Sequence, residues 1–238
     1  MQQRQTFSGP LLSPFAAFSL QVAIFGAGVA LLAAFFLPTV VWVLFALAVV
    51  SLAVGQSLAN GDYPHDVFGL HNTVTLVRAC LVCLLFGTVF ATQAVPSWLV
   101  FGVSGVALAL DGVDGWLARR AGLVSEFGAR FDVEADSALA ATLSLWLLFS
   151  GTTGLEILLL GFTRYAFVIA GWAVPRLRAE LPPAFRRKAI CVVQIGTLIL
   201  LTLPFLPTGL VFALSLGASV ALMYSFAIDL HYLLRRAT

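Results

Sequence analysis

The chain contains one markedly acidic stretch, Asp111-Gly-Val-Asp114-Gly115-Trp-Leu-Ala118-Arg119, which is followed by Gly128, Asp132 and Asp136. Asp111 and Asp114 are three residues apart, and Asp132 and Asp136 are four apart, so each pair shares a face if its segment is helical. Carboxylates gathered in an apolar environment repel each other unless a cation or a proton lies between them. The stretch therefore predicts a cation site; the alternative is a set of solvated helix ends.

The rest of the sequence is strongly apolar. Of its 238 residues, 61% are hydrophobic and only 10% are charged, whereas a soluble domain has about 25% charged residues. The apolar runs are continuous rather than alternating, which favours helices over a β-barrel. We therefore predict an all-α integral membrane protein, a bundle of about eight transmembrane helices of roughly 20 residues each. Nothing in this composition implies a nucleic-acid partner.

Proline, glycine and polar residues divide the chain after a polar lead-in of residues 1–14. The eight predicted spans cover residues 15–37, 39–58, 72–92, 96–111, 131–150, 154–174, 189–203 and 208–230. Asn72 or Thr73 is the predicted N-cap of the third span. Residues 115–130 are predicted to form a polar connection, and residues 175–188 a basic loop.

The thirteen Lys and Arg residues indicate how the chain is oriented. All of them lie on the side of the termini and of residues 59–71, 112–130 and 175–188, or in the half-helix nearest that side. None lies in the turns on the opposite side. Positive charge is enriched on the cytoplasmic side of membrane proteins. We therefore predict that both termini and the Asp stretch face the cytoplasm, with the bacterial inner membrane as the expected location.

The two Asp pairs are expected to meet at the cytoplasmic edge of the bundle, because the spans that carry them are adjacent and antiparallel. Four carboxylates there form an oxygen-rich site suited to Mg²⁺, Mn²⁺ or Ca²⁺. Arg119 can bind a phosphate, and the glycines allow the backbone to approach a ligand closely. A carboxylate beside the metal can act as general base for an attacking hydroxyl. Together these features predict a diphosphate-bearing substrate.

The spacing of the acidic stretch from Asp111 to Asp136 resembles the signature of the CDP-alcohol phosphotransferase (phosphatidyltransferase) family at every fixed position. Asn72-x-x-Thr75-x-x-Arg78 also resembles the segment that opens the six-helix core of that family. The resemblance implies that residues 72–238 form this core. Residues 1–71 would then be the lead-in and two additional transmembrane helices.

The resemblance also implies roles for two groups of residues. The ligands of a divalent cation, Mg²⁺ or Mn²⁺, would be Asp111, Asp114, Asp132 and Asp136. Asp136 would also be the catalytic general base. The CDP and diphosphate pocket would be lined by Gly115, Ala118, Arg119 and Gly128.

The implied reaction transfers a phosphatidyl or other phospho-alcohol group from a CDP-alcohol to an acceptor hydroxyl and releases CMP. CDP-diacylglycerol is one such donor, and phospholipid synthesis is the expected setting. The implied partners are this CDP-linked donor, an alcohol acceptor, membrane lipids and a second copy of the chain in a homodimer.

Basic residues outside the signature are candidates for binding the acceptor: Arg130, Arg164, Arg186, Arg187 and Lys188. Each has a simpler alternative. Arg130 can pair with Glu126 or Glu134, Arg164 can be a structural partner or extend to the membrane edge, and the other three can be positive-inside anchors.

Three further polar residues are predicted to have structural roles. Glu134 is turned away from Asp132 by their spacing of two and is left out of the metal site. Gln194 is expected to form a hydrogen bond within the bundle. Asp229 is expected to pair with Arg235 or Arg236.

Two other classes of protein also place carboxylates near membranes. An intramembrane prenyltransferase also uses Asp-rich metal sites on helix ends. It would need two Asp motifs spread over separate spans, usually with an Asn leading the first, and the Gly-Ala-Arg-Gly pattern here does not suit it. A cation-linked transporter would carry acidic residues at several depths or discontinuous helices in repeated halves. Both remain alternatives to the phosphotransferase.

Overall fold

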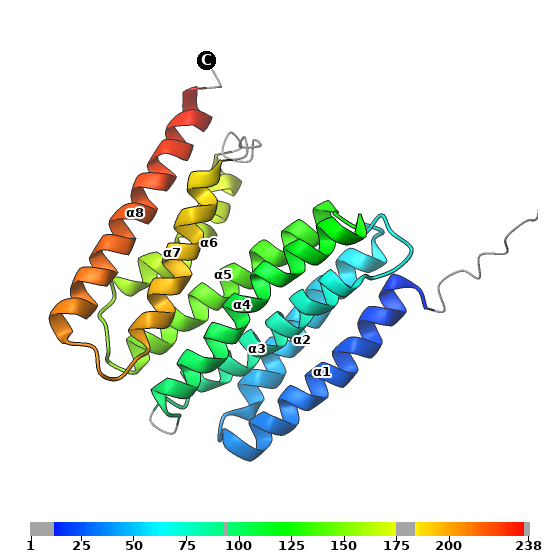
Figure 1. Cartoon of the computed structure of the whole chain (residues 1–238), viewed down its shortest axis with the longest axis horizontal. Helices are drawn as coiled ribbons and strands as arrows, with labels where there is room; N and C mark the ends of the chain where they lie inside the picture. The colour runs from blue at the N-terminus through cyan, green and yellow to red at the C-terminus, as the bar shows by residue number, and fades with distance from the viewer. Residues whose placement is uncertain (1–11, 93–94, 175–183, 236–238) are drawn as a thin grey trace, which may run out of the picture.

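The computed structural model describes residues 12–92, 95–174 and 184–235, which form eight α-helices and no strand (Figure 1). The helices are α1 (Pro14–Phe36), α2 (Val40–Ala59), α3 (Leu70–Val89), α4 (Ser97–Ala121), α5 (Glu126–Phe149), α6 (Ile157–Ala173), α7 (Phe185–Leu201) and α8 (Thr208–Arg235). Five of the described helices, α1 to α4 and α8, are long and apolar enough to cross a membrane. The prediction of an all-α, multi-pass membrane protein is confirmed.

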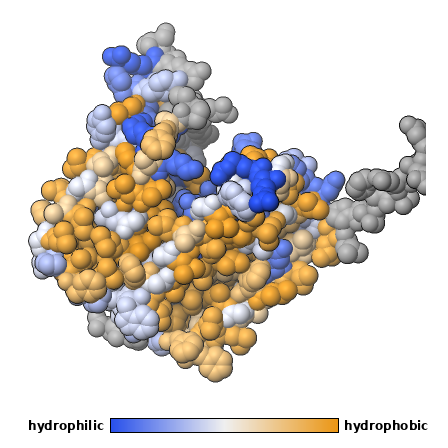
Figure 2. Space-filling view, viewed as in Figure 1, coloured by the Kyte–Doolittle hydropathy of each residue, from blue (hydrophilic) through white to orange (hydrophobic). Residues whose placement is uncertain are grey.

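The surface of the bundle has two zones (Figure 2). Hydrophobic side chains cover most of the visible face, and hydrophilic ones gather at the upper end of this view. Many large apolar side chains are exposed, among them Phe35, Leu52 and Trp172. An apolar surface of this extent is stable against lipid chains rather than water.

Helix α3 lies at the centre of the N-terminal half, because α1, α2, α4 and α5 all pack against it. The additional helices approach it closely at Gly87. A Cβ atom at this position would lie 2.3 Å from the Cγ2 of Val43 on α2. The Thr39 hydroxyl also donates a hydrogen bond to the Gly87 carbonyl, at 2.7 Å. Glycine thus lets α2 dock on α3 by direct backbone approach.

The predicted start of α3 at Asn72 or Thr73 is wrong. The helix begins at Leu70, and the residue before it is Gly69, whose φ of 76° favours glycine. Asn72 lies inside the first turn, and its Nδ2 donates to the Phe68 carbonyl at 2.7 Å. Asn72 therefore fixes the entry to the helix from a position three residues after the N-cap, Gly69.

Tyr63 holds the loop before α3 in place. Its hydroxyl donates to the carbonyls of Val67 and Phe68, at 3.0 and 3.1 Å. Its ring packs edge-on against Phe127 of α5. Burial raises the pKa of the Tyr63 hydroxyl, so it stays neutral and remains a donor. The loop thereby ties the start of α3 to the start of α5.

The predicted end of the fourth span near Asp111 and the predicted polar connection of residues 115–130 are also wrong. Helix α4 continues to Ala121, and Gly122, with a φ of 66°, ends it in the left-handed conformation. Helix α5 begins at Glu126, where the Ser125 hydroxyl accepts from the Gly128 amide at 3.0 Å. The acidic stretch therefore lies on two helices rather than on a loop. Hydropathy marks where the apolar stretch ends, whereas backbone hydrogen bonds carry the helix beyond it.

Candidate active site

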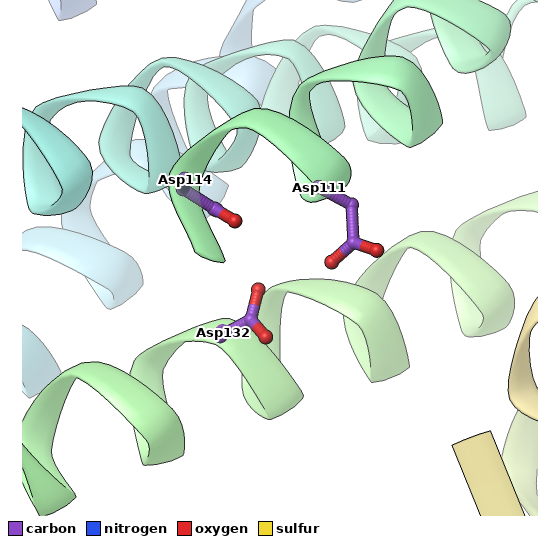
Figure 3. Close-up of side chains that lie close together, drawn as sticks. All are labelled: Asp111, Asp114 and Asp132. Atoms are coloured by element: carbon purple, nitrogen blue, oxygen red, sulfur yellow. The ribbon is translucent and has the colours of Figure 1, made fainter. Parts of the chain in front are cut away.

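Three carboxylates of the acidic stretch converge between α4 and α5. Asp111 and Asp114 project from α4 and Asp132 projects from α5, and the three side chains point toward one another (Figure 3). One oxygen from each lies within 4.8 Å of the others. Side-chain rotation can bring such oxygens within the ~4.2 Å that separates opposite ligands of one Mg²⁺ ion. The donor set, made only of carboxylate oxygens, fits Mg²⁺ or Mn²⁺.

Arg78 of α3 lies directly among these carboxylates. Its Nη1 is 3.2 Å from Asp111, 2.8 Å from Asp114 and 2.6 Å from Asp132. Its Nη2 donates to Asp136, one turn after Asp132 on α5. The side chain of Arg78 is only 2% exposed. A single buried guanidinium thus gathers all four aspartates of the stretch.

The cluster carries more negative than positive charge. One guanidinium cannot balance four ionised carboxylates, which repel each other strongly when they are withdrawn from water. Asp114 is also polarised by neutral donors: the Thr75 hydroxyl at 2.9 Å and the Gly115 amide at 2.6 Å. The site therefore favours an additional cation.

Arg119 is exposed on α4, one turn after Gly115. A Cβ atom at Gly115, one turn earlier, would lie 3.3 Å from Nη1 of Arg119. The guanidinium therefore folds back over Gly115, and Ala118 is half-buried beside it. A larger residue at position 115 would displace this side chain, so the glycine leaves room for Arg119 on this face of α4.

Gly128 meets the start of α3. A Cβ atom there would lie 3.3 Å from Oδ1 of Asn72 and 3.8 Å from Nε2 of His71. Both side chains are buried, and Oδ1 of Asn72 and both ring nitrogens of His71 have no hydrogen-bond partner in the part of the chain that the structure describes. Buried polar atoms without partners are costly. The small residue at position 128 thus faces polar groups that could bind a ligand.

Two of the candidate acceptor residues lie elsewhere. Arg130 pairs with Glu126 at 2.5 Å, on the exposed surface of α5. Arg164 of α6 forms two hydrogen bonds with Glu134, at 2.9 and 2.6 Å. Glu134 is not part of the carboxylate group between α4 and α5, as expected from its spacing. The structure gives both arginines carboxylate partners outside the Asp cluster.

The basic residues at the start of α7 are joined to α8. Arg186 donates to the Ser225 carbonyl at 2.6 Å and contacts Asp229 at 2.5 Å, and Arg187 lies 3.3 Å from the same carboxylate. Asp229, which was expected to pair with Arg235 or Arg236, thus contacts two arginines of α7, and Arg236 lies outside the described residues. Lys188 is exposed.

The predicted structural role of Gln194 is confirmed, since its Nε2 donates to the Leu160 carbonyl of α6. Arg78 and Thr75 are the main site residues for which the sequence led to no predicted role. A signal existed for Arg78, because a lone arginine within an apolar span needs a counter-ion. The four aspartates of the acidic stretch, predicted at the same edge of the bundle, were the candidates for this counter-ion.

With this geometry established, the chain can be placed in a family. The model of the CDP-alcohol phosphatidyltransferase family matches residues 68–226, so the chain belongs to this family. Its members are transferases of phosphate-containing groups. Comparison with curated proteins and with solved structures gives no match. The matched region contains α3 to α7 and most of α8, and it includes the whole Asp cluster.

Proposed function

We propose that the protein is a metal-dependent CDP-alcohol phosphotransferase. It transfers a phosphatidyl or other phospho-alcohol group from a CDP-alcohol, such as CDP-diacylglycerol, to the hydroxyl of an acceptor and releases CMP. The observation that carries this proposal is the convergence of Asp111, Asp114 and Asp132 within 4.8 Å inside the region that matches the family.

The metal would bind between α4 and α5, where the carboxylates lie together. Asp111, Asp114 and Asp132 would hold Mg²⁺ or Mn²⁺, with Asp136 as a further ligand. When bound, the ion neutralises charge that develops on the diphosphate of the donor. Arg119, folded over Gly115 at the exposed edge of the site, supplies a second positive charge for that diphosphate.

Asp136 is the residue we assign as general base. It takes the proton of the acceptor hydroxyl while the oxygen forms a bond to the β-phosphorus of the donor. The bond between this phosphorus and the bridging oxygen of the diphosphate breaks, and the electron pair leaves with CMP. Asp136 contacts only one nitrogen of Arg78, whereas the other nitrogen serves the remaining three aspartates. It is the aspartate best separated from the group of three.

The nucleotide would lie between α4, α5 and the start of α3. Gly115, Ala118 and Gly128 keep this space free of bulky side chains. Polar atoms of His71 and Asn72 beside Gly128, which have no hydrogen-bond partner among the described residues, supply groups that can bind a polar ring. With the nucleotide in this position, the acceptor can approach Asp136 from the side of α5 that packs against α7.

Several features support a cytoplasmic site in an inner membrane. The Arg residues that end α4 and α8 and the basic residues at the start of α7 lie at one end of the bundle. This is the arrangement that the positive-inside rule associates with the cytoplasm. The transporter alternative receives less support, because three of the carboxylates form one group at a single place between α4 and α5. The prenyltransferase alternative receives less support, because the region that carries the Asp cluster matches the CDP-alcohol phosphatidyltransferase family.

The direct test measures CMP release by the purified protein. CDP-diacylglycerol and Mg²⁺ or Mn²⁺ are supplied with a panel of acceptors: glycerol phosphate, inositol phosphate, serine and amino alcohols. We expect release that depends on both the metal and one acceptor. Failure of every CDP-alcohol and acceptor pair to release CMP would refute the proposal, and cation uptake by liposomes without CMP release would favour the transporter.

The Asp136→Asn variant tests the general base. We expect CMP release to fall by about 10²- to 10⁴-fold, the usual contribution of a general base, while the apparent melting temperature in detergent changes little. Glu134→Gln is the matched control, because it alters a carboxylate on the same helix that pairs with Arg164 instead. It should retain activity within about twofold. Equal rates for Asp136→Asn and the wild type would remove Asp136 from the mechanism.

A further inference from the structure

A cavity lies between α2 and α5, and none of the four aspartates of the Asp cluster lines it. It has a volume of about 640 Å³. Helices α2 and α5 each pack against α3 without extensive contact with each other, so α3 forms the floor of a groove. Small side chains keep the groove open: Ala53 on α2, Ala79 on α3, and Ala135 and Ala138 on α5. We call this cavity the α2–α5 groove.

The α2–α5 groove is polar at one end and apolar at the other. Val49, Val50 and Ala53 of α2 and Ala138 of α5 line the apolar end. The polar end is formed by Ser57, Asp62, Glu126, Arg130 and Glu134. On α5 the lining extends from residue 126 to residue 138, about 18 Å along the axis. This gradient matches one amphipathic molecule that lies along the helices with its polar end at the membrane surface.

The groove is distinct from the candidate active site. Arg130, Glu134 and Ala138 follow one another at intervals of four and share one face of α5. Asp132 and Asp136 occupy the opposite face, where they contact Arg78. One wall of the groove, α2, also precedes residue 68, where the match to the family begins. The groove is therefore formed by α2 together with the matched region and not by the matched region alone.

The charges at the polar end are unevenly paired. Arg130 contacts Glu126, and Glu134 contacts Arg164. Asp62 accepts a hydrogen bond from the Ser57 hydroxyl at 2.6 Å, and among the described residues no cation lies within salt-bridge distance of it. The polar end of the groove thus presents two groups. One is the guanidinium of Arg130, which contacts Glu126, and the other is the carboxylate of Asp62, which has no cationic partner among the described residues. A phosphate and an ammonium group together complement this pair.

From these observations we propose that the α2–α5 groove binds one phospholipid with a zwitterionic, amine-bearing head. An acyl chain lies against Val49, Val50 and Ala53, the phosphate contacts Arg130, and the ammonium group contacts Asp62. The membrane supplies such a molecule at high concentration, and a groove of this apolar lining gains free energy when a chain fills it. The lipid thereby completes the contact between the additional helices and α5.

Native mass spectrometry of the full chain in detergent tests the proposal. The delipidated protein is offered equal amounts of phosphatidylethanolamine and phosphatidylglycerol with the same chains, without any CDP-alcohol. We expect one tightly bound phosphatidylethanolamine. Ala53→Trp, which fills the groove, should lower the fraction of lipid-bound protein at least fivefold. Leu52→Trp, at an exposed position next to it on α2, is the matched control and should bind lipid as the wild type does.

Asp62→Asn tests the head group. It should remove the preference for phosphatidylethanolamine over phosphatidylglycerol and still allow one lipid to bind. If Ala53→Trp does not elute as a folded protein, Ala138→Leu fills the same groove from α5 and decides the outcome. Equal lipid binding by the groove-filled variant and the wild type would overturn the proposal. So would conversion of a dimer to a monomer by Ala53→Trp with no loss of lipid, since a second copy would then occupy the groove.

Discussion

Two charged clusters in this molecule have opposite compositions. Between α3, α4 and α5, one arginine, Arg78, contacts four aspartates. Between α7 and α8, one aspartate, Asp229, contacts two arginines. Each cluster joins side chains that are far apart in sequence, and each contains a nearly buried member: Arg78 in the first and Asp229 in the second.

The difference lies in which charge is in excess and where it lies. In the Asp cluster the excess is negative and is held around a buried guanidinium, so a further cation stabilises the cluster. In the second cluster the guanidinium groups are 26% and 30% exposed, so water can solvate the excess charge. The first arrangement is suited to binding a metal, and the second to holding α7 against α8. Substitutions in the two clusters should therefore have different consequences.

The largest contrast is expected between Asp114→Asn and Asp229→Asn. Both changes replace a buried carboxylate by its neutral isostere. Asp114→Asn removes a metal ligand and should lower CMP release by about 10²-fold or more, because the charge of the diphosphate is no longer neutralised. Asp229→Asn should leave the rate per folded molecule within about threefold. Rates are measured with saturating Mn²⁺ and normalised to folded protein by size-exclusion chromatography. Similar losses in both variants would contradict the distinction between the clusters.

Arg78→Gln and Arg186→Gln provide the next contrast, in stability without metal. Arg78→Gln leaves four carboxylates without their guanidinium, and breaking a buried ion pair in this way costs about 3–5 kcal/mol. Arg186→Gln leaves Asp229 paired with Arg187 and should cost about 1 kcal/mol. Thermal unfolding in detergent with EDTA measures both. Addition of Mn²⁺ should restore stability to Arg78→Gln far more than to Arg186→Gln. Equal responses to Mn²⁺ would show that the Asp cluster is not the metal site.

The sequence predicts much of this arrangement because its signals are local. Continuous apolar runs locate the helices, and spacings of three and four place Asp111 with Asp114 and Asp132 with Asp136 on helical faces. Their meeting across α4 and α5 was expected because the two spans are adjacent and antiparallel, although the connection is the short segment 122–125 rather than residues 115–130. The helix ends could not be predicted as well, since α4 continues for ten residues beyond Asp111 to Ala121, where polar residues keep their backbone hydrogen bonds.

Contacts over long distances in sequence could not be predicted. The partners of Asp229 lie on α7, 42 and 43 residues away, and spacing alone favoured the arginines near the end of the same helix. Arg78 lies 36 to 58 residues from the aspartates it hydrogen-bonds. Its central position depends on the packing of α3 against both α4 and α5, which no local pattern specifies. The α2–α5 groove likewise results from two helices that share α3 as a neighbour.

The smallest effect is expected for Thr75→Val, which tests the neutral donor within the Asp cluster. The Thr75 hydroxyl lies 2.9 Å from Asp114 and 3.1 Å from the His71 carbonyl. Its loss should weaken Mn²⁺ binding by about 10-fold, the usual effect of removing a group that orients a ligand. Thr88→Val is the matched control. Thr88 is also buried on α3, but its hydroxyl donates only to the Leu85 carbonyl among the described residues.

The two valine variants separate orientation of the ligand from stability of the helix. Each should lower the free energy of unfolding by about 1 kcal/mol, the net contribution of one hydrogen bond. Only Thr75→Val should shift the Mn²⁺ concentration that gives half-maximal CMP release. An equal shift in Thr88→Val would mean that α3 affects the metal through its general packing. An unchanged Mn²⁺ requirement in Thr75→Val would mean that Arg78 and the Gly115 amide suffice to orient Asp114.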